Sequence, residues 1–164
     1  MGLKTELGRL ITAPGVKPIQ AVQWQRQGFY LYGLVAPLTG DRFFYEFSHL
    51  DGVCFEQFLK LVAAAFPNQL NVIQLDQASA HTTDQIEIPE NIVLLFQPSH
   101  SPELNPIERV WQDIKADLKG EVFDNLDALR AALREVLGYL TPDWLASLSG
   151  YDYILSALSV AGIN

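Results

Sequence analysis

Cysteine is almost absent from this sequence, which contains Cys54 alone among 164 residues. A lone thiol cannot close an intrachain disulfide, and it cannot supply the set of thiolates that holds a structural zinc ion. Because Cys54 stands among Phe55, Phe58 and Leu59, we expect it to be a small residue of the core. A disulfide scaffold and a zinc finger are therefore excluded.

Long apolar runs are also missing. The longest candidates, such as residues 61–66 and 93–96, fall far short of the roughly 20 residues that cross a bilayer. No charged start leads into an apolar stretch and a cleavage site. We therefore expect a cytoplasmic protein without a membrane partner. With 49% hydrophobic residues, the chain can bury one real core but is too short for two ordinary domains.

Basic residues are scarce, since 11 lysines and arginines stand against 19 aspartates and glutamates, which gives a net charge of -8. Proteins that bind duplex DNA by themselves usually present a basic face to the phosphates. The sequence also has no basic run and no plausible helix-turn-helix. The charge counts against autonomous DNA binding, but a metal-dependent nuclease core stays compatible because divalent cations neutralise acidic side chains.

The apolar pattern predicts one domain over residues 1–164, with an irregular leader at 1–22 and helices at its C-terminal end, 121–164. Runs rich in β-branched and aromatic residues predict strands, the first two as an antiparallel hairpin, and a spacing of three to four predicts helices. Together they indicate an α/β fold with a mixed sheet flanked by helices. The predicted strands are 29–35, 43–47, 71–75 and 91–96, and the predicted helices are 55–66, 107–118, 124–140, one from 141 and 151–158.

Asp76 follows the apolar strand at 71–75 directly. A carboxylate at the carboxyl end of a buried strand is held by a rigid element beside the crevice where open α/β sheets bind ligands. This is a good position for a metal ligand. An aspartate at such a junction is also a common turn former that accepts hydrogen bonds from nearby amides.

Glu108 lies in the first turn of the predicted helix at 107–118. Asn105 as N-cap, Pro106 as first helical residue and Glu108 as third would form a capping box, which explains Glu108 without any chemistry. Only 31 residues lie between Asp76 and Glu108, and they form one loop, one buried strand and one turn. With so short a connection, Asp76 and Glu108 could form one site. The alternative is that Asp76 is a turn residue and Glu108 a helix cap.

The segments around these acids are the residues that carry a family resemblance. LDQASAH around Asp76 and PSHSPELNPIERVWQDIK around Glu108 resemble the second and third signature blocks of DDE transposases, those of the mariner-like superfamily and its bacterial insertion-sequence relatives. YLYGLVAPLTG and SGYDYILSAL are similar to the bacterial branch. The resemblance covers nearly the whole chain.

The resemblance implies a ribonuclease-H-like fold in which three carboxylates hold two divalent ions, Mg²⁺ or Mn²⁺. Asp76 matches the second carboxylate and Glu108 the third, so both are the expected catalytic and metal-binding residues. The implied activity is cleavage and strand transfer of DNA, with transposon ends and target DNA as partners. A homodimer is a further candidate partner arrangement.

The first carboxylate of the family has no match in this sequence. In the family it ends the first, central strand, and Met1 aligns just after that strand. The acids before Asp76 have simpler explanations as leader, turn, strand or helix-start residues; they are Glu6, Asp41, Glu46, Asp51 and Glu56. We therefore expect a truncated core that binds metal weakly or not at all and is inactive alone. Residues 16–24 or a partner copy would fill the empty strand position.

Two other functions stay open from the sequence. One is a non-catalytic protein that keeps the transposase fold and dimerises through its sheet edge and C-terminal helices. The other is an unrelated metal-dependent nuclease or phosphatase, in which Glu46 or Asp84 would supply the third carboxylate.

Four further residues invite functional interpretations. His81 lacks a second histidine at ligand spacing, which favours a hydrogen bond within its loop. His100 stands between serines but in no nucleophile elbow, so we assign it no hydrolase role. Trp111 is expected to pack in the core, and Lys115 reaches a phosphate only where its helix face is open.

Overall fold

The computed structural model describes residues 1–4, 12–17, 19, 21–77, 86–99, 101 and 104–163. Its elements follow one another in the order predicted from the pattern. The strands are β1 (Tyr30–Val35), β2 (Arg42–Phe47), β3 (Asn71–Leu75) and β4 (Ile92–Phe96), and the helices are α1 (Gly52–Ala65), α2 (Ile107–Asp117), α3 (Leu126–Tyr139), α4 (Pro142–Ser149) and α5 (Asp152–Val160).

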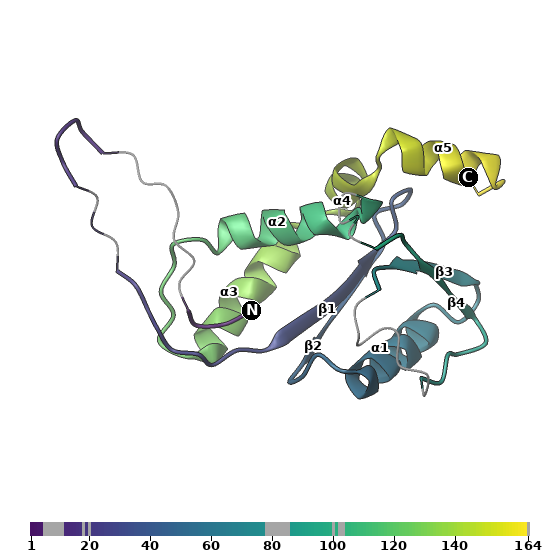
Figure 1. Cartoon of the computed structure of the whole chain (residues 1–164), viewed down its shortest axis with the longest axis horizontal. Coiled ribbons are helices and arrows are strands. Elements are labelled where there is room, and N and C mark those ends of the chain that lie inside the picture. Colours follow the sequence, from purple (N-terminus) through teal and green to yellow (C-terminus); the bar gives the residue numbers. More distant parts are fainter. Residues whose placement is uncertain are drawn as a thin grey trace.

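β1 and β2 form an antiparallel hairpin in which Tyr30 is paired with Phe47 and Val35 with Arg42. Because successive side chains of a strand point to opposite faces, the hairpin has two distinct sides. Odd-numbered residues of β1, such as Leu31, pack with the helices α2 and α3, whereas Tyr32 packs with α1. The hairpin thus separates two hydrophobic clusters, as Figure 1 shows by its central place between the helices.

β3 and β4 form a parallel pair in the register Asn71 to Ile92 and Leu75 to Phe96. α1 covers one face of this pair, where Ile73 and Leu75 pack with the helix. The helix begins after Asp51, whose side chain accepts a hydrogen bond from the amide of Cys54 at 2.8 Å. An acceptor at this position satisfies an amide that the first turn leaves unpaired. Cys54 itself packs against the same cluster, as predicted.

The helices α2, α3 and α4 form the second cluster around buried apolar side chains from several elements. α4 starts at Thr141, whose hydroxyl accepts from the amide of Trp144 at 3.2 Å. Gly40 in the hairpin turn has φ +70 and lies so close to the backbone of Pro142 that no side chain would fit. The turn therefore rests directly on α4. The fully buried members of the cluster include Leu3, Val110, Ile114 and Leu145.

The structure corrects the prediction of one mixed sheet. Instead, β1 pairs with β2 and β3 with β4 in two separate two-stranded sheets. The described residues of the segment 16–24, which we expected as one filler of the empty strand position, belong to no strand. They form an extended loop that projects from the helices (Figure 1) and returns to them at Gln23 and Trp24, which lie beside the end of α2. Across the described ranges, the second edge of β1 and that of β3 are left without a paired strand.

None of the helices is long and apolar enough to span a membrane, a finding that applies to the described residues.

Candidate active site at the carboxyl end of β3

The carboxyl ends of β3 and β4 are joined by a network of polar groups. The amide of Gln97 donates to the carbonyl of Leu75 at 3.0 Å, which extends the strand pairing by one step. The Gln77 side chain donates to the carbonyl of Gln97 at 3.1 Å and accepts from the Ser99 hydroxyl at 2.8 Å. Gln97 is only 6% exposed. Asp76 therefore sits on backbone that is fixed on both sides.

Gln74 links this strand end to the approach of α2. Its side-chain amide donates to the carbonyl of Leu104 at 2.8 Å and to the Gln97 side chain at 3.3 Å. Side chains two apart along an extended chain share a face, so Asp76 projects on the same side as Gln74. That side is opposite to α1, which packs on Ile73 and Leu75. Asp76 is thus exposed on the face from which α2 begins.

Glu108 is the second residue of α2 and half-buried. The predicted capping box is not formed as expected, because the helix starts at Ile107 and its N-cap is Pro106, which makes no side-chain cap. The Asn105 side chain accepts only a long 3.4 Å contact from the amide of Ile107. Within the described residues, no hydrogen bond or ion pair involves the Glu108 carboxylate. Capping therefore does not account for this side chain.

Two carboxylates on facing elements fit part of a site for a hard divalent cation, which prefers carboxylate oxygen. In the described part of the chain, no group of three or more aspartate, glutamate, histidine or cysteine side chains could hold a metal ion. The chemistry of the donor set thus fits Mg²⁺ or Mn²⁺, but the described residues provide only a fraction of a two-ion site.

The other described acids that precede Asp76 have structural roles. Asp51 caps α1, and Asp41 accepts from the Thr39 hydroxyl at 2.8 Å in the hairpin turn. Glu56 forms an ion pair with Lys60 at 2.7 Å, which holds the pKa of that carboxyl below its usual value. Asp51 and Asp41 match the explanations given by their positions in the sequence, whereas Glu56, which was expected to act at the helix start, lies beyond the first turn of α1. Glu6 and Asp84 lie outside the described residues.

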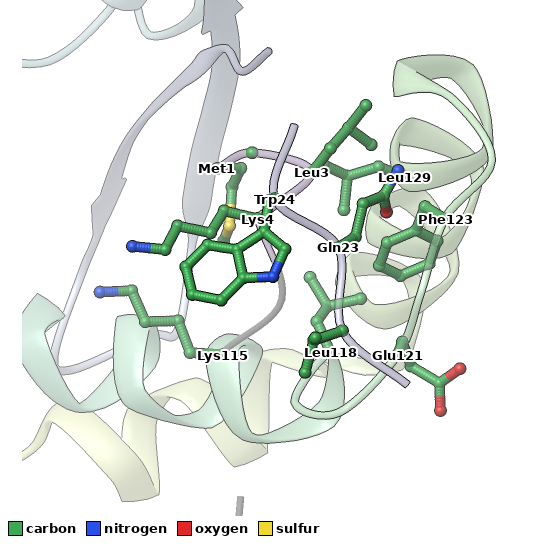
Figure 2. A pocket seen from close by; sticks show the side chains of 12 residues that line it. Met1, Leu3, Lys4, Gln23, Trp24, Lys115, Leu118, Glu121, Phe123 and Leu129 are labelled. Atoms are coloured by element: carbon green, nitrogen blue, oxygen red, sulfur yellow. The ribbon is translucent and has the colours of Figure 1, made fainter. Parts of the chain in front are cut away.

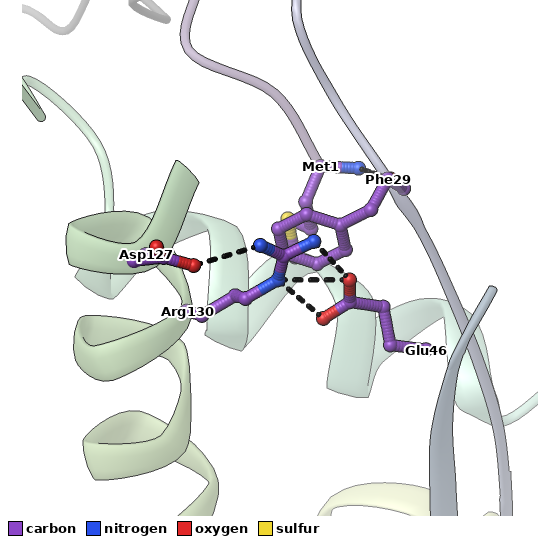
Figure 3. Close-up of polar contacts among 5 residues, drawn as sticks. All are labelled: Met1, Phe29, Glu46, Asp127 and Arg130. Carbon is purple, nitrogen blue, oxygen red and sulfur yellow. Dashed lines mark hydrogen bonds and ion pairs between the residues drawn. The ribbon is translucent and has the colours of Figure 1, made fainter. Parts of the chain in front are cut away.

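Glu46 is bound to Arg130 of α3, 84 positions away in the sequence. Figure 3 shows the guanidinium between Glu46 and Asp127, with contacts as short as 2.6 Å to Glu46 and 2.9 Å to Asp127. The hydrogen bonds to Glu46, and then to Asp127, raise the pKa of Arg130. Arg130 also lies 5.3 Å from the centre of the Phe29 ring. The ion pair between Glu46 and Arg130 therefore links the hairpin to α3. This role argues against the hypothesis that Glu46 is a third metal ligand.

The remaining sequence candidates divide into two groups. Trp111 packs edge-on against Phe44, with ring centres 5.8 Å apart, as expected of a core residue. Lys115 is exposed, and an open helix face is the condition under which we expect its side chain to reach a phosphate. His81 and His100 lie outside the described residues. The side chains of Gln74, Gln77 and Gln97 were not predicted to belong to the site, although polar residues at the ends of two buried strands were a visible signal.

Comparison with known proteins gives a consistent result. Residues 1–130 match the family described as DDE superfamily endonuclease. A protein of Sinorhizobium fredii (strain NBRC 101917 / NGR234), described as uncharacterized protein y4pE/y4sA, is 33% identical over 100 residues, which are 60% of this chain and 74% of that protein.

Two solved structures are similar in fold. One is a Mos1 transposase paired-end complex with the left transposon end, with a TM-score of 0.69 and 13% identity over 91% of this chain and 48% of that one. The other is the Mos1 strand transfer complex, with a TM-score of 0.69 and 15% identity over 99% of this chain and 52% of that one. The chain thus spans about half the length of the structures that it matches.

The family match over most of the chain and the shared fold lead to one conclusion. This chain belongs to the DDE superfamily endonucleases and has the mixed α/β, ribonuclease-H-like fold found in the matched part of the Mos1 transposase.

Proposed function

We propose that this chain is the part of a DNA transposase core that supplies the second and third metal-binding carboxylates, Asp76 and Glu108. The observation that carries the proposal is the hydrogen bond from Gln74 to Leu104, which joins the strand bearing Asp76 to the approach of α2. It brings the two elements together on the face of β3 opposite α1. The two acids then converge on one site.

Bound divalent ions would activate the attacking oxygen and stabilise the leaving oxygen at a phosphodiester. The chain's own residues hold and orient the ligands. Gln77 and Gln97 fix the backbone on either side of Asp76, and α2 presents Glu108 from its first turn.

We further propose that the first carboxylate comes from a strand that lies between β1 and β3. The pairing of Met1 with Phe29 supports this position. Met1 donates from its amino group to the Phe29 carbonyl at 2.8 Å and accepts from the Phe29 amide at 2.8 Å. Gly2 and Gly28 form an antiparallel bridge at the same place. Residues placed ahead of Met1 in extended form would continue this ladder along β1.

The edge of β1 to which Met1 is bound follows from the alternation of peptide groups along a strand. The amide of Ala36 donates to Asp41 on the β2 side, so even-numbered residues of β1 point their peptide groups towards β2. The peptide groups of Phe29 and of the odd-numbered residues of β1 point to the opposite edge of the strand. Met1 forms its hydrogen bonds with Phe29 at that edge. A continuing strand would therefore occupy the edge left unpaired in the described part of the sheet.

This register predicts where an aspartate would stand. Residues directly opposite in an antiparallel pair share a face, and the odd-numbered side chains of β1, such as Leu31, face α2. Counting back from the pair of Met1 and Phe29, the second residue before Met1 would face Leu31, and the fourth would face Gly33. An aspartate at the second, fourth or sixth place would share the face of Asp76 and Glu108.

DNA is the proposed substrate, in the form of transposon ends and target, and Mg²⁺ or Mn²⁺ the proposed cofactor. The likeness in fold to a transposase bound to a transposon end supports this reading. Because two carboxylates hold a metal weakly and leave the two-ion site incomplete, the 164 residues alone are expected not to cleave or join DNA.

Titration with Mn²⁺ by calorimetry tests whether the two acids share a site. We expect weak binding to the parent chain and none to the variant Asp76→Ala, Glu108→Ala. A suitable control is Glu90→Ala, Asp117→Ala, which removes two exposed acids and changes the net charge equally. The control should bind Mn²⁺ as the parent does. Equal loss in both variants would mean that the ion responds to overall charge, and the shared site would be wrong.

A second candidate function is a non-catalytic interaction protein with the same fold. Exposed apolar side chains on the Asp76 face of the second sheet favour it, namely Val72 at 54%, Val93 at 45% and Leu95 at 55% exposure. On this reading the chain dimerises through that face and needs no metal. Analytical sedimentation of the parent chain and of a Val93→Lys, Leu95→Lys variant gives their oligomeric states. The interaction-protein hypothesis predicts that the parent is a dimer through this face and that the variant is a monomer, whereas the transposase-core hypothesis does not require this dimer.

A further inference from the structure

A cavity of about 740 Å³ opens at the far end of α2, away from Glu108. It is formed where the first residues of the chain meet the extended loop and the link between α2 and α3. Figure 2 shows the indole of Trp24 in its middle, with Lys4 and Lys115 on one side. Glu121 lines the cavity on the other side of the indole.

The two lysines give the cavity a local positive charge. Their ammonium groups lie on the same side of the indole, while the carboxylate of Glu121 lies on the opposite side (Figure 2). Among the residues that the structure describes, neither Lys4 nor Lys115 forms an ion pair. Two like charges that line one cavity repel each other, and a bound anion would relieve this cost.

The N-terminal segment that lines the cavity is basic, whereas the chain as a whole is acidic. The first 27 residues contain four basic residues, Lys4, Arg9, Lys17 and Arg26, and a single acid, Glu6, in a chain with a net charge of -8. The basic character is therefore concentrated in the segment that lines the cavity. Charge complementarity favours a polyanion as the occupant.

Trp24 adds an aromatic surface to this positive site. Its side chain is 74% exposed, and Lys4 lies 5.8 Å from its ring centre. An exposed indole costs free energy in water, and every nucleic-acid base can stack on such a ring. The combination of a cationic pair and an open indole is what a single nucleotide requires, with a phosphate for the lysines and a base for the tryptophan.

The cavity is also aligned with the proposed catalytic site. Lys115 follows Glu108 by seven residues, which is close to two turns, so both side chains project from the same side of α2. Their separation along the helix is about 10 Å. A DNA strand that runs along this side of α2 would therefore contact both sites within a few nucleotides.

We propose that this cavity binds one nucleotide of the DNA strand that leads to the catalytic phosphate. Lys4 and Lys115 contact its phosphate, and its base stacks on Trp24. This inference rests on the proposed function for the identity of the strand, because the cavity chemistry by itself specifies only a nucleotide. Lys115 also has a favourable position near the helix C-terminus, but that explains neither Lys4 beside it nor the exposed indole.

The test is the binding of a short fluorescein-labelled single strand to the whole chain, measured by anisotropy in EDTA at several salt concentrations. We expect Trp24→Ala to weaken binding roughly tenfold. The variant Lys4→Gln, Lys115→Gln should lower the slope of log affinity against log salt by about one for each lysine. The matched control, Lys119→Gln, Arg134→Gln, removes two exposed charges outside the cavity and should keep the parent slope.

Either of two results would overturn the inference. In the first, the cavity variant and the control lose affinity equally, which would show a response to net charge. In the second, the parent chain does not bind the strand even at low salt. Because EDTA removes the metal from the assay, both results are independent of Asp76 and Glu108. If strand binding is as expected but the Asp76→Ala, Glu108→Ala variant binds Mn²⁺ as the parent does, the proposed function would be contradicted and the cavity assignment would stay in place.

Discussion

A six-residue extension ahead of Met1, with valine alternating with threonine, is expected to raise the free energy of unfolding of this chain by about 3 kcal/mol. The extension continues the ladder that Met1 and Phe29 begin and pairs with β1 as far as Val35. The measurement is chemical denaturation of the parent and extended chains under the same conditions.

The expected gain has two physical sources. Buried valines contribute about 1.5–3 kcal/mol each, and paired backbone groups add about 1 kcal/mol for each hydrogen bond. The cost of ordering the added residues, about 1–2 kcal/mol each, offsets much of this. The net effect is favourable because a strand between β1 and β3 would pair on both sides and join the two sheets into one.

The matched control carries the same extension with proline at alternate positions. Proline has no amide hydrogen to donate, so this version cannot pair along β1. It should leave the stability of the parent unchanged. An equal gain from both extensions, or no gain from either, would contradict the proposed strand position.

Local pattern predicted most of the secondary structure because the relevant interactions are close in sequence. The residue range of β3 was predicted as found, and the start of α1 near Asp51 follows from a hydrogen bond made within the first helical turn. The hairpin was likewise set by two β-rich runs and a short turn. Such features depend on side chains only a few residues apart.

The continuity of the sheet could not be predicted in the same way. Apolar alternation shows that a segment is a strand, but the partner of that strand is fixed by contacts far away in sequence. The segment 16–24 was expected as one possible filler of the empty position, yet its described residues form a loop. The capping box failed for a local reason, because Pro106 occupies the N-cap, where it makes no side-chain hydrogen bond, and Asn105 makes only a long contact with the amide of Ile107.

The candidate site was visible only in part. Asp76 and Glu108 were predicted from their sequence blocks, and a site shared by the two carboxylates stays a prediction. The glutamine network around them depends on how two loops meet, which no spacing reveals. The cavity at Trp24 brings together the first residues, the loop and the end of α2, so its lysines could not be recognised as neighbours from sequence.

The second large expected effect concerns catalysis. In an extended chain with aspartate at the second place before Met1, three carboxylates would share one face, and Mg²⁺-dependent nicking of DNA is expected. Replacing Asp76 by asparagine in that chain should reduce nicking roughly a thousandfold or more, because metal ions supply several kcal/mol of transition-state stabilisation and each 1.36 kcal/mol is about tenfold in rate.

The proposed three-carboxylate site is tested by a plasmid-nicking assay with Mg²⁺ on three extended chains. Each carries aspartate at the second, third or fourth place before Met1. The register predicts nicking with aspartate at the second or fourth place, its loss when Asp76→Asn is added, and none at the third, which faces α1. If nicking is equal with aspartate at all three places, or if it survives Asp76→Asn, the proposed site is wrong.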